Sequence, residues 1–95
     1  SIPDGIGNLI NLEELLLNNN QLSGSIPDGI GNLINLEELL LNNNQLSGNV
    51  PESICDLEII NDGTYWFNLE NNKLCPPYPE CVEGLLGSQR LTNCK

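Results

Sequence analysis

The chain has 95 residues, which is room for one domain with a modest core. Its formal net charge is −10, with three basic residues (Lys73, Arg90 and Lys95), which argues against nucleic acid or an anionic membrane as partner, because both need a basic surface. Histidine is absent, which excludes Ser–His and Cys–His catalysis, and no apolar run approaches a membrane span. Methionine and an apolar leader are absent too, so we expect a processed, excised or renumbered product.

The first 24 residues, SIPDGIGNLINLEELLLNNNQLSG, recur without a change as residues 25–48. A fixed period of this length predicts a solenoid, in which each coil buries its apolar face against its neighbours. Both copies contain the spacing LxxLxLxxNxL, which is filled by Leu12, Leu15, Leu17, Asn20 and Leu22 and then by Leu36, Leu39, Leu41, Asn44 and Leu46.

This spacing resembles a leucine-rich repeat, and the tail LSGSIP (Leu22 to Pro27) is similar to the plant-type subfamily. The resemblance implies an α/β solenoid, a right-handed coil with a short parallel sheet on its concave side and extended or 3₁₀ segments on its convex side. We expect strands at Glu14 to Asn18 and Glu38 to Asn42. Alternation points Leu15 and Leu17 inward and leaves Glu14, Leu16 and Asn18 on the concave face.

The asparagines of the motif fall where the chain leaves each strand. A buried amide there must find partners, and its donors can bond backbone carbonyls of its own and the next coil. We therefore expect a structural asparagine ladder without a binding role, formed by Asn20, Asn44 and, in the third coil, Asn72. After the corner, Asp28 to Leu33 should form a short helical or 3₁₀ turn capped by Asp28, with Ile30, Leu33 and Leu36 pointing inward.

Identity over 24 residues extends to positions that packing does not force to match, such as Asn19 with Asn43 and Gln21 with Gln45. We interpret this as an idealised, designed repeat in preference to a very recent duplication.

A varied third coil follows in residues 49–74. Trp66 to Leu74 restore the motif at an offset of 28 residues, so four residues are inserted, which we place in a turn within Asn61 to Tyr65. The outward residues of the third strand are then Trp66, Asn68 and Glu70.

Residues 75–95 begin a fourth coil, which we expect to turn helical through about Leu86 and to stop at Gly87. This end resembles the C-terminal caps of bacterial leucine-rich repeat proteins and the end of plant polygalacturonase inhibitors. We expect one domain, residues 1–95, made of repeats 1–24, 25–48 and 49–74 and this cap.

Four cysteines, Cys55, Cys75, Cys81 and Cys94, are confined to the C-terminal part. They indicate a disulfide-stapled cap and an oxidising compartment, hence a secreted or cell-surface protein if the chain is natural. Zinc is the weaker alternative, because no CxxC pair is present. Three pairings are possible, and we favour Cys75 with Cys81 and Cys55 with Cys94.

The first coil has no preceding cap in this sequence, so its leucines should be partly open beside an unpaired strand edge. Two explanations stay open. Either the domain was cut from a longer array, or two copies form a homo-oligomer through this coil by a two-fold contact.

We take the concave face as the candidate binding surface, formed by Glu14, Leu16, Asn18, Glu38, Leu40, Asn42, Trp66, Asn68 and Glu70. Glu14 and Glu38, joined by Glu70, would make a site for a cation or basic peptide, although a solvated consensus surface is the simpler interpretation. A row of Leu16, Leu40 and Trp66 would be an apolar strip for a partner, unless leucine is only the average choice there and Trp66 packs against the inserted loop or the cap.

Three functions are weighed, none of them catalytic and none with a cofactor. We rank first a designed scaffold that binds proteins, second the C-terminal fragment of a natural adhesion or recognition protein, and third an inhibitor similar to the polygalacturonase inhibitors.

Overall fold

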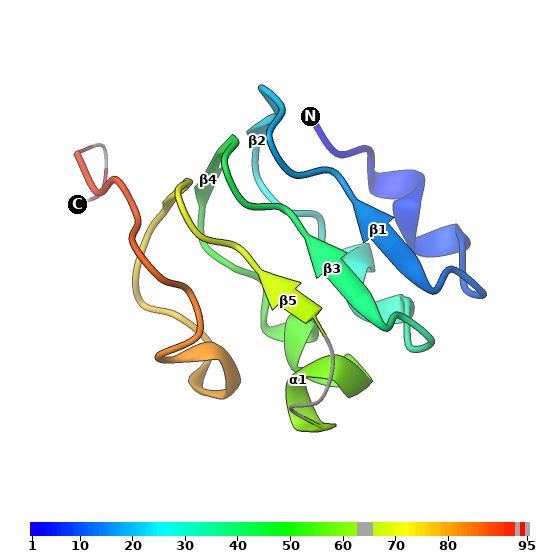
Figure 1. Cartoon of the computed structure of the whole chain (residues 1–95). Coiled ribbons are helices and arrows are strands. Elements are labelled where there is room, and N and C mark those ends of the chain that lie inside the picture. Colours follow the sequence, from blue (N-terminus) through cyan, green and yellow to red (C-terminus); the bar gives the residue numbers. More distant parts are fainter. Residues whose placement is uncertain (63–65, 93, 95) are drawn as a thin grey trace.

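The computed structural model describes residues 1–62, 66–92 and 94. The chain winds into stacked right-handed coils and measures 35 × 24 × 21 Å along its principal axes, which confirms the predicted solenoid (Figure 1). We name residues 1–24 coil 1, 25–48 coil 2, 49–74 coil 3 and 75–95 the cap. None of the helices in the described part of the chain has the length and apolar character needed to cross a membrane.

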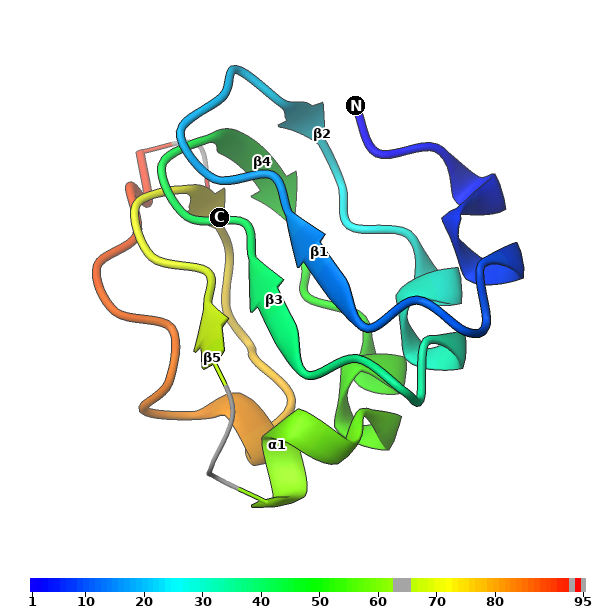
Figure 2. The ribbon, with the colours of Figure 1, turned by 45° about the vertical axis from the view of Figure 1, so that its right-hand side comes forward.

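Two parallel sheets run along the stack. The concave sheet has the order β1 (Glu14–Leu16), β3 (Glu38–Leu40) and β5 (Trp66–Asn68), which lie side by side in Figures 1 and 2. The second sheet has the order β2 (Ser23–Gly24), β4 (Gln45–Gly48) and β6 (Lys73–Leu74). The concave strands are shorter than predicted, but their ladder continues, since the amides of Leu17 and Asn19 donate to the carbonyls of Leu40 and Asn42 at 2.9 and 3.0 Å.

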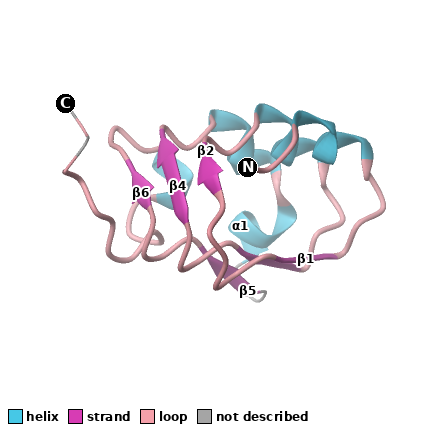
Figure 3. Cartoon of the chain, turned by 90° about the horizontal axis from the view of Figure 1, so that it is seen from above, coloured by secondary structure: helices cyan, strands magenta, loops and turns pink. Residues whose placement is uncertain are grey.

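Short 3₁₀ helices line the side of the stack away from the concave sheet (Figure 3). They are η1 (Asp4–Asn8), η2 (Asp28–Asn32), η3 (Glu52–Asp56) and η4 (Glu80–Val82). Glycine allows their close stacking, since a Cβ at Gly31 would lie 2.5 Å from the carbonyl oxygen of Ser53. The predicted Asp28 cap is wrong. The helix begins at Asp28 itself, so Pro27 occupies the N-cap position, and no side chain caps the helix.

Two other local predictions need correction. Asn61 and Asp62 do not form a turn, because they end the helix α1 (Glu58–Asp62), while Gly63 to Tyr65 lie outside the described residues. In the cap, helical structure ends at Val82 and does not reach Leu86.

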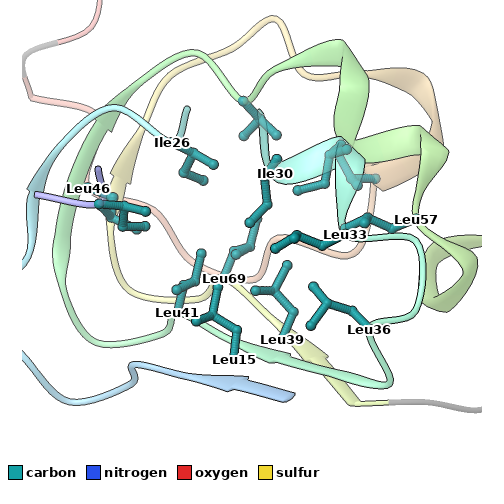
Figure 4. Packing of buried hydrophobic residues seen from close by; sticks show 14 of the residues in the cluster. Leu15, Ile26, Ile30, Leu33, Leu36, Leu39, Leu41, Leu46, Leu57 and Leu69 are labelled. Atoms are coloured by element: carbon teal, nitrogen blue, oxygen red, sulfur yellow. The ribbon is translucent and has the colours of Figure 1, made fainter. Parts of the chain in front are cut away.

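The core is a continuous column of aliphatic side chains inside the coils (Figure 4). Ile30, Leu33 and Leu36 are fully or almost fully buried, as predicted. Because the first two coils have the same sequence, differences between them report only the neighbours of each coil. Leu33 is 0% exposed and the equivalent Leu9 is 51% exposed. Coil 1 therefore covers coil 2, and its own outer face is open in this chain.

Both disulfides are in the C-terminal part, but the favoured pairing is wrong. Cys55 pairs with Cys81 and Cys75 pairs with Cys94, with Cα–Cα distances of 5.8 and 5.6 Å. Cys55 belongs to η3 and Cys81 to η4, and α-carbons of neighbouring coils lie within disulfide range. Cys75 directly follows β6 on the second sheet, whereas Cys81 belongs to η4. The proline-rich segment between them separates these two cysteines.

The cap also contains a tyrosine with a shifted ionisation. The Tyr78 hydroxyl donates to the Leu74 carbonyl at 2.8 Å, and burial raises the pKa of Tyr78 above 10.0. The folded state therefore favours the protonated phenol, and this contribution to stability is present below the pKa of the unfolded chain and is lost as pH rises through the folded pKa.

We expect an alkaline titration of Tyr65→Phe, in which Tyr78 is the remaining tyrosine, to give a midpoint above 10.0 by ultraviolet absorbance. The denatured variant should titrate at a lower pH. A folded midpoint equal to the denatured one would contradict the assigned burial.

Candidate functional site

The candidate site is the concave face, and the strand register fixes which of its residues are neighbours. Glu14 pairs with Glu38 and Glu38 with Trp66. Leu16 pairs with Leu40 and Leu40 with Asn68. Side chains alternate along a strand, so these two sets form parallel rows that run across β1, β3 and β5.

The register corrects two sequence expectations. Trp66 does not extend the row of Leu16 and Leu40, because Asn68 takes that place. Trp66 instead extends the acidic row, which it ends in place of Glu70. We name Glu14, Glu38 and Trp66 the carboxylate–indole row.

Exposure is uneven across this face. Trp66 is 69% exposed and Leu16 is 49% exposed, while Leu40, in the central strand, is half-buried. An indole exposed to this degree is not buried against the cap, and residues 63–65 of the inserted loop lie outside the described residues.

The described basic side chains lie away from the concave strands. Lys73 belongs to β6 of the second sheet, and the Arg90 guanidinium donates to the Asn44 carbonyl at 2.8 Å. The carboxylates of Glu14, Glu38 and Glu70 therefore leave the concave face negative.

Asn42 follows β3 in the middle of the face, next in alternation after Leu40. Its Oδ1 is shielded from solvent and receives no hydrogen bond from any described residue. Within the described residues this is a carbonyl oxygen that still needs a donor.

An inner asparagine ladder lies behind the face, but its amide donors bond the preceding coil and not the next coil as predicted. The Asn44 Nδ2 donates to the carbonyls of Leu17 and Leu41 at 2.9 and 3.0 Å, and its Oδ1 accepts from the Leu22 amide at 3.0 Å. Asn72 repeats these contacts one coil later and is 0% exposed. Asn20 is exposed, and its side-chain bonds to described residues stay within its own coil.

Sequence reasoning missed the last member of this ladder, Gln89. Its Nε2 donates to the Leu69 carbonyl at 2.8 Å, and its Oε1 accepts from the Leu74 amide at 3.1 Å. A signal was available, since LGSQRL (Leu86 to Leu91) has the LxxNxL spacing with glutamine in place of asparagine. Gln89 thus continues the inner ladder with the same amide chemistry that the coils use.

A second, exposed ladder runs beside the first. The Asn43 Nδ2 donates to the Asn19 Oδ1 at 2.6 Å, and the Asn71 Nδ2 donates to the Asn43 Oδ1 at 2.8 Å. All three residues have positive φ values, 59°, 61° and 61°. Asparagine tolerates this left-handed region better than other residues with a side chain. The identity of Asn19 and Asn43 is therefore required by the backbone, and it no longer counts as support for design.

We expect Asn43→Ala to lower the free energy of unfolding by about 1–2 kcal/mol, because alanine loses both ladder bonds and is strained at positive φ. Asn43→Gly loses the same bonds without the strain, so it should be less destabilised. Urea unfolding of both variants measures the difference, and equal losses would mean that backbone conformation is not the reason for asparagine here.

One open hollow of about 410 Å³ is lined by Asn8, Leu9, Ile10, Asn11 and Leu12. It lies on coil 1, away from the concave rows. In the part of the chain that the structure describes, no group of three or more His, Cys, Asp or Glu side chains is arranged to hold a metal ion.

The comparisons with known proteins agree with this geometry. The family model described as Leucine Rich Repeat matches residues 11–33 and 35–57. No curated protein matches the chain. Among solved structures, the chain is similar to one described as PEPR1-AtPEP1, with a TM-score of 0.79 and 29% identity over 94% of this chain and 13% of that one. It is also similar to one of the BIR3–SERK2 complex from Arabidopsis thaliana, with a TM-score of 0.71 and 34% identity over 95% of this chain and 46% of that one. The chain thus spans less than half the length of either structure.

Proposed function

This chain belongs to the leucine-rich repeat family, and we propose that it is a non-enzymatic scaffold that binds a protein partner on its concave face. The observation that carries the proposal is the exposure of Trp66 and Leu16 on the face formed by β1, β3 and β5. Tryptophan is a common anchor at protein interfaces. The similar structures support a protein partner, since one is a BIR3–SERK2 complex and another pairs PEPR1 with AtPEP1.

The two disulfides support a secreted or cell-surface location, because such bonds persist in oxidising compartments. We retain the designed, idealised repeat as the preferred origin. The C-terminal fragment of a natural recognition protein is the alternative, and it would use the same concave face. Inhibition of a polygalacturonase ranks below both, because coils 1 and 2 present the same residues on this face.

Selection from a displayed library of random peptides tests the scaffold proposal without assuming the partner's chemistry. We expect the selected peptides to bind the chain and to lose binding to Trp66→Ala. The matched control is Ile34→Ala, which removes an apolar side chain that is 55% exposed outside the concave sheet. Peptides that bind Trp66→Ala normally but lose binding to Ile34→Ala would overturn the concave-face proposal.

A second function, self-association through coil 1, is favoured by the open outer face of this coil. Leu9 and Ile10 are 51% and 57% exposed beside the hollow, and β1 is an edge strand. We propose that two copies cover this surface by a two-fold contact, which closes on itself.

Light scattering on a sizing column over a range of concentrations tests this second proposal. We expect a mass near twice 10.4 kDa, and a monomer mass for Leu9→Lys. Ile34→Lys, a control in coil 2, should remain dimeric. A monomer at every concentration for the parent chain would overturn self-association and leave the concave-face proposal untouched.

A further inference from the structure

We propose that the partner of the concave face is an extended basic segment with two Lys or Arg residues at positions i and i+2. One cation lies on the Trp66 indole and the other lies between the carboxylates of Glu14 and Glu38. This inference rests on the proposed scaffold function and specifies the chemistry of its partner.

The order of side chains in the carboxylate–indole row is the first observation that supports a basic partner. Glu38 is the direct cross-strand neighbour of Trp66 and of Glu14, so the row reads carboxylate, carboxylate, indole along the stack. Neighbouring side chains of one row lie close enough to contact the same ligand group. An aromatic face attracts a guanidinium or ammonium group, and an adjacent carboxylate adds to that attraction.

The spacing of the row sets the spacing of the cations. Neighbouring strands are about 5 Å apart, so the midpoint between Glu14 and Glu38 lies about 7 Å from the Trp66 position. In an extended segment, residues i and i+2 point to the same side and are also separated by about 7 Å. A segment that runs along the stack therefore places two alternate side chains over the indole and between the carboxylates.

The adjacent row of Leu16 and Leu40 can contact the apolar part of a Lys or Arg side chain. Leu16 and the half-buried Leu40 lie beside the two carboxylates and offer an apolar surface for the methylene groups of Lys or Arg. The Glu70 carboxylate lies further along the same face and accepts hydrogen bonds from a guanidinium or from the segment's backbone.

Charge complementarity selects a basic partner over an acidic one. The whole chain carries −10, and the described basic residues, Lys73 and Arg90, lie outside the concave strands. An acidic segment would bring like charge next to Glu14 and Glu38, whereas a basic one is steered toward them.

The test uses three synthetic peptides with blocked ends: GSRSRSG, GSRRSSG and GSESESG. The first two have the same composition and charge and differ only in the spacing of their arginines. Binding is followed by the fluorescence of Trp66, which is the chain's only tryptophan. We expect GSRSRSG to bind about tenfold more tightly than GSRRSSG, GSESESG not to bind, and the affinity for GSRSRSG to fall as NaCl is raised from about 0.05 to about 0.5 M.

Two double variants separate the row from general charge. Glu14→Gln with Glu38→Gln removes the carboxylates of the row, and Glu13→Gln with Glu37→Gln removes the same charge from the preceding exposed residues. We expect the first pair to weaken GSRSRSG binding about tenfold by calorimetry, and the second to change it by about twofold or less. Equal weakening by both pairs, equal affinity for the two arginine peptides, or no binding of either would overturn the inference.

Failure of this inference is distinguishable from failure of the scaffold function. If library selection yields peptides without basic residues that still require Trp66, the concave face binds a partner of other chemistry, and the basic segment is wrong. A neutral sugar polymer that quenches Trp66 and competes with the selected peptides would overturn the inference in the same way.

Discussion

Asn44→Ala is expected to lower the free energy of unfolding by about 3 kcal/mol, because it leaves several buried backbone groups without partners. The Asn44 Nδ2 donates to the carbonyls of Leu17 and Leu41, which belong to different coils. The Asn44 Oδ1 accepts a hydrogen bond from the Leu22 amide. Its side chain is 3% exposed, so water does not replace these bonds in the folded variant.

The repeated sequence supplies a matched control, Asn20→Ala. Asn20 has the same neighbours in sequence, but it is exposed, and among the described residues its side chain bonds the carbonyls of Leu17 and Asn18. We expect this variant to lower the free energy of unfolding by about 1 kcal/mol or less, because water can bond the carbonyls that lose the Asn20 amide. Urea unfolding with disulfides intact measures both variants. Equal losses would mean that local sequence, and not the stacking of coils, makes the asparagine important.

We expect the double substitution Cys55→Ser with Cys81→Ser to lower the free energy of unfolding by about 3.5 kcal/mol, the value that the chain-entropy treatment gives for loss of this disulfide. The bond spans 26 residues and joins η3 of coil 3 to η4 of the cap. Its loss frees the cap from the coil that it covers, and solenoid coils depend on their neighbours for stability.

We therefore expect coil 3 to unfold before coils 1 and 2 in this variant. Trp66 in β5 reports on coil 3 through its fluorescence, whereas far-ultraviolet circular dichroism reports on all coils. The fluorescence transition should occur at lower urea than the dichroism transition. Coincident transitions at the parent's urea midpoint would contradict the role assigned to this bond.

The architecture follows from features that the repeat itself displays. Leucines and asparagines at fixed spacing predict the inward side chains and the inner ladder, and the structure contains both, as Leu39, Leu41 and Asn44 show. These predictions succeed because each coil must solve the same burial problem, so one motif determines every turn.

Features that break the repeat were harder to predict. The α1 helix occupies part of the inserted residues, where Asn61 and Asp62 had suggested a turn, because four extra residues are too few for sequence to choose between a helical turn and a loop. The pairing of Cys55 depends on which turns stack in three dimensions, and spacing along the chain does not contain that information.

The assignment of the concave face as a binding site stays a prediction, and the strand register changes its predicted arrangement. Apolar character groups Trp66 with Leu16 and Leu40, whereas its offset of 28 from Glu38 places it in the carboxylate–indole row. The row of Asn19, Asn43 and Asn71 had no predicted reason, because a positive φ is a property of the folded corner and not of residue periodicity.

The central claim, that partners bind the concave face, is tested most directly by amide NMR spectra of the chain titrated with the selected library peptides. We expect the largest shift changes in β1, β3 and β5, above all at Glu38, Leu40 and Trp66, with little change in η1 to η4. Shift changes concentrated in the 3₁₀ helices, with the three concave strands unaffected, would contradict the claim.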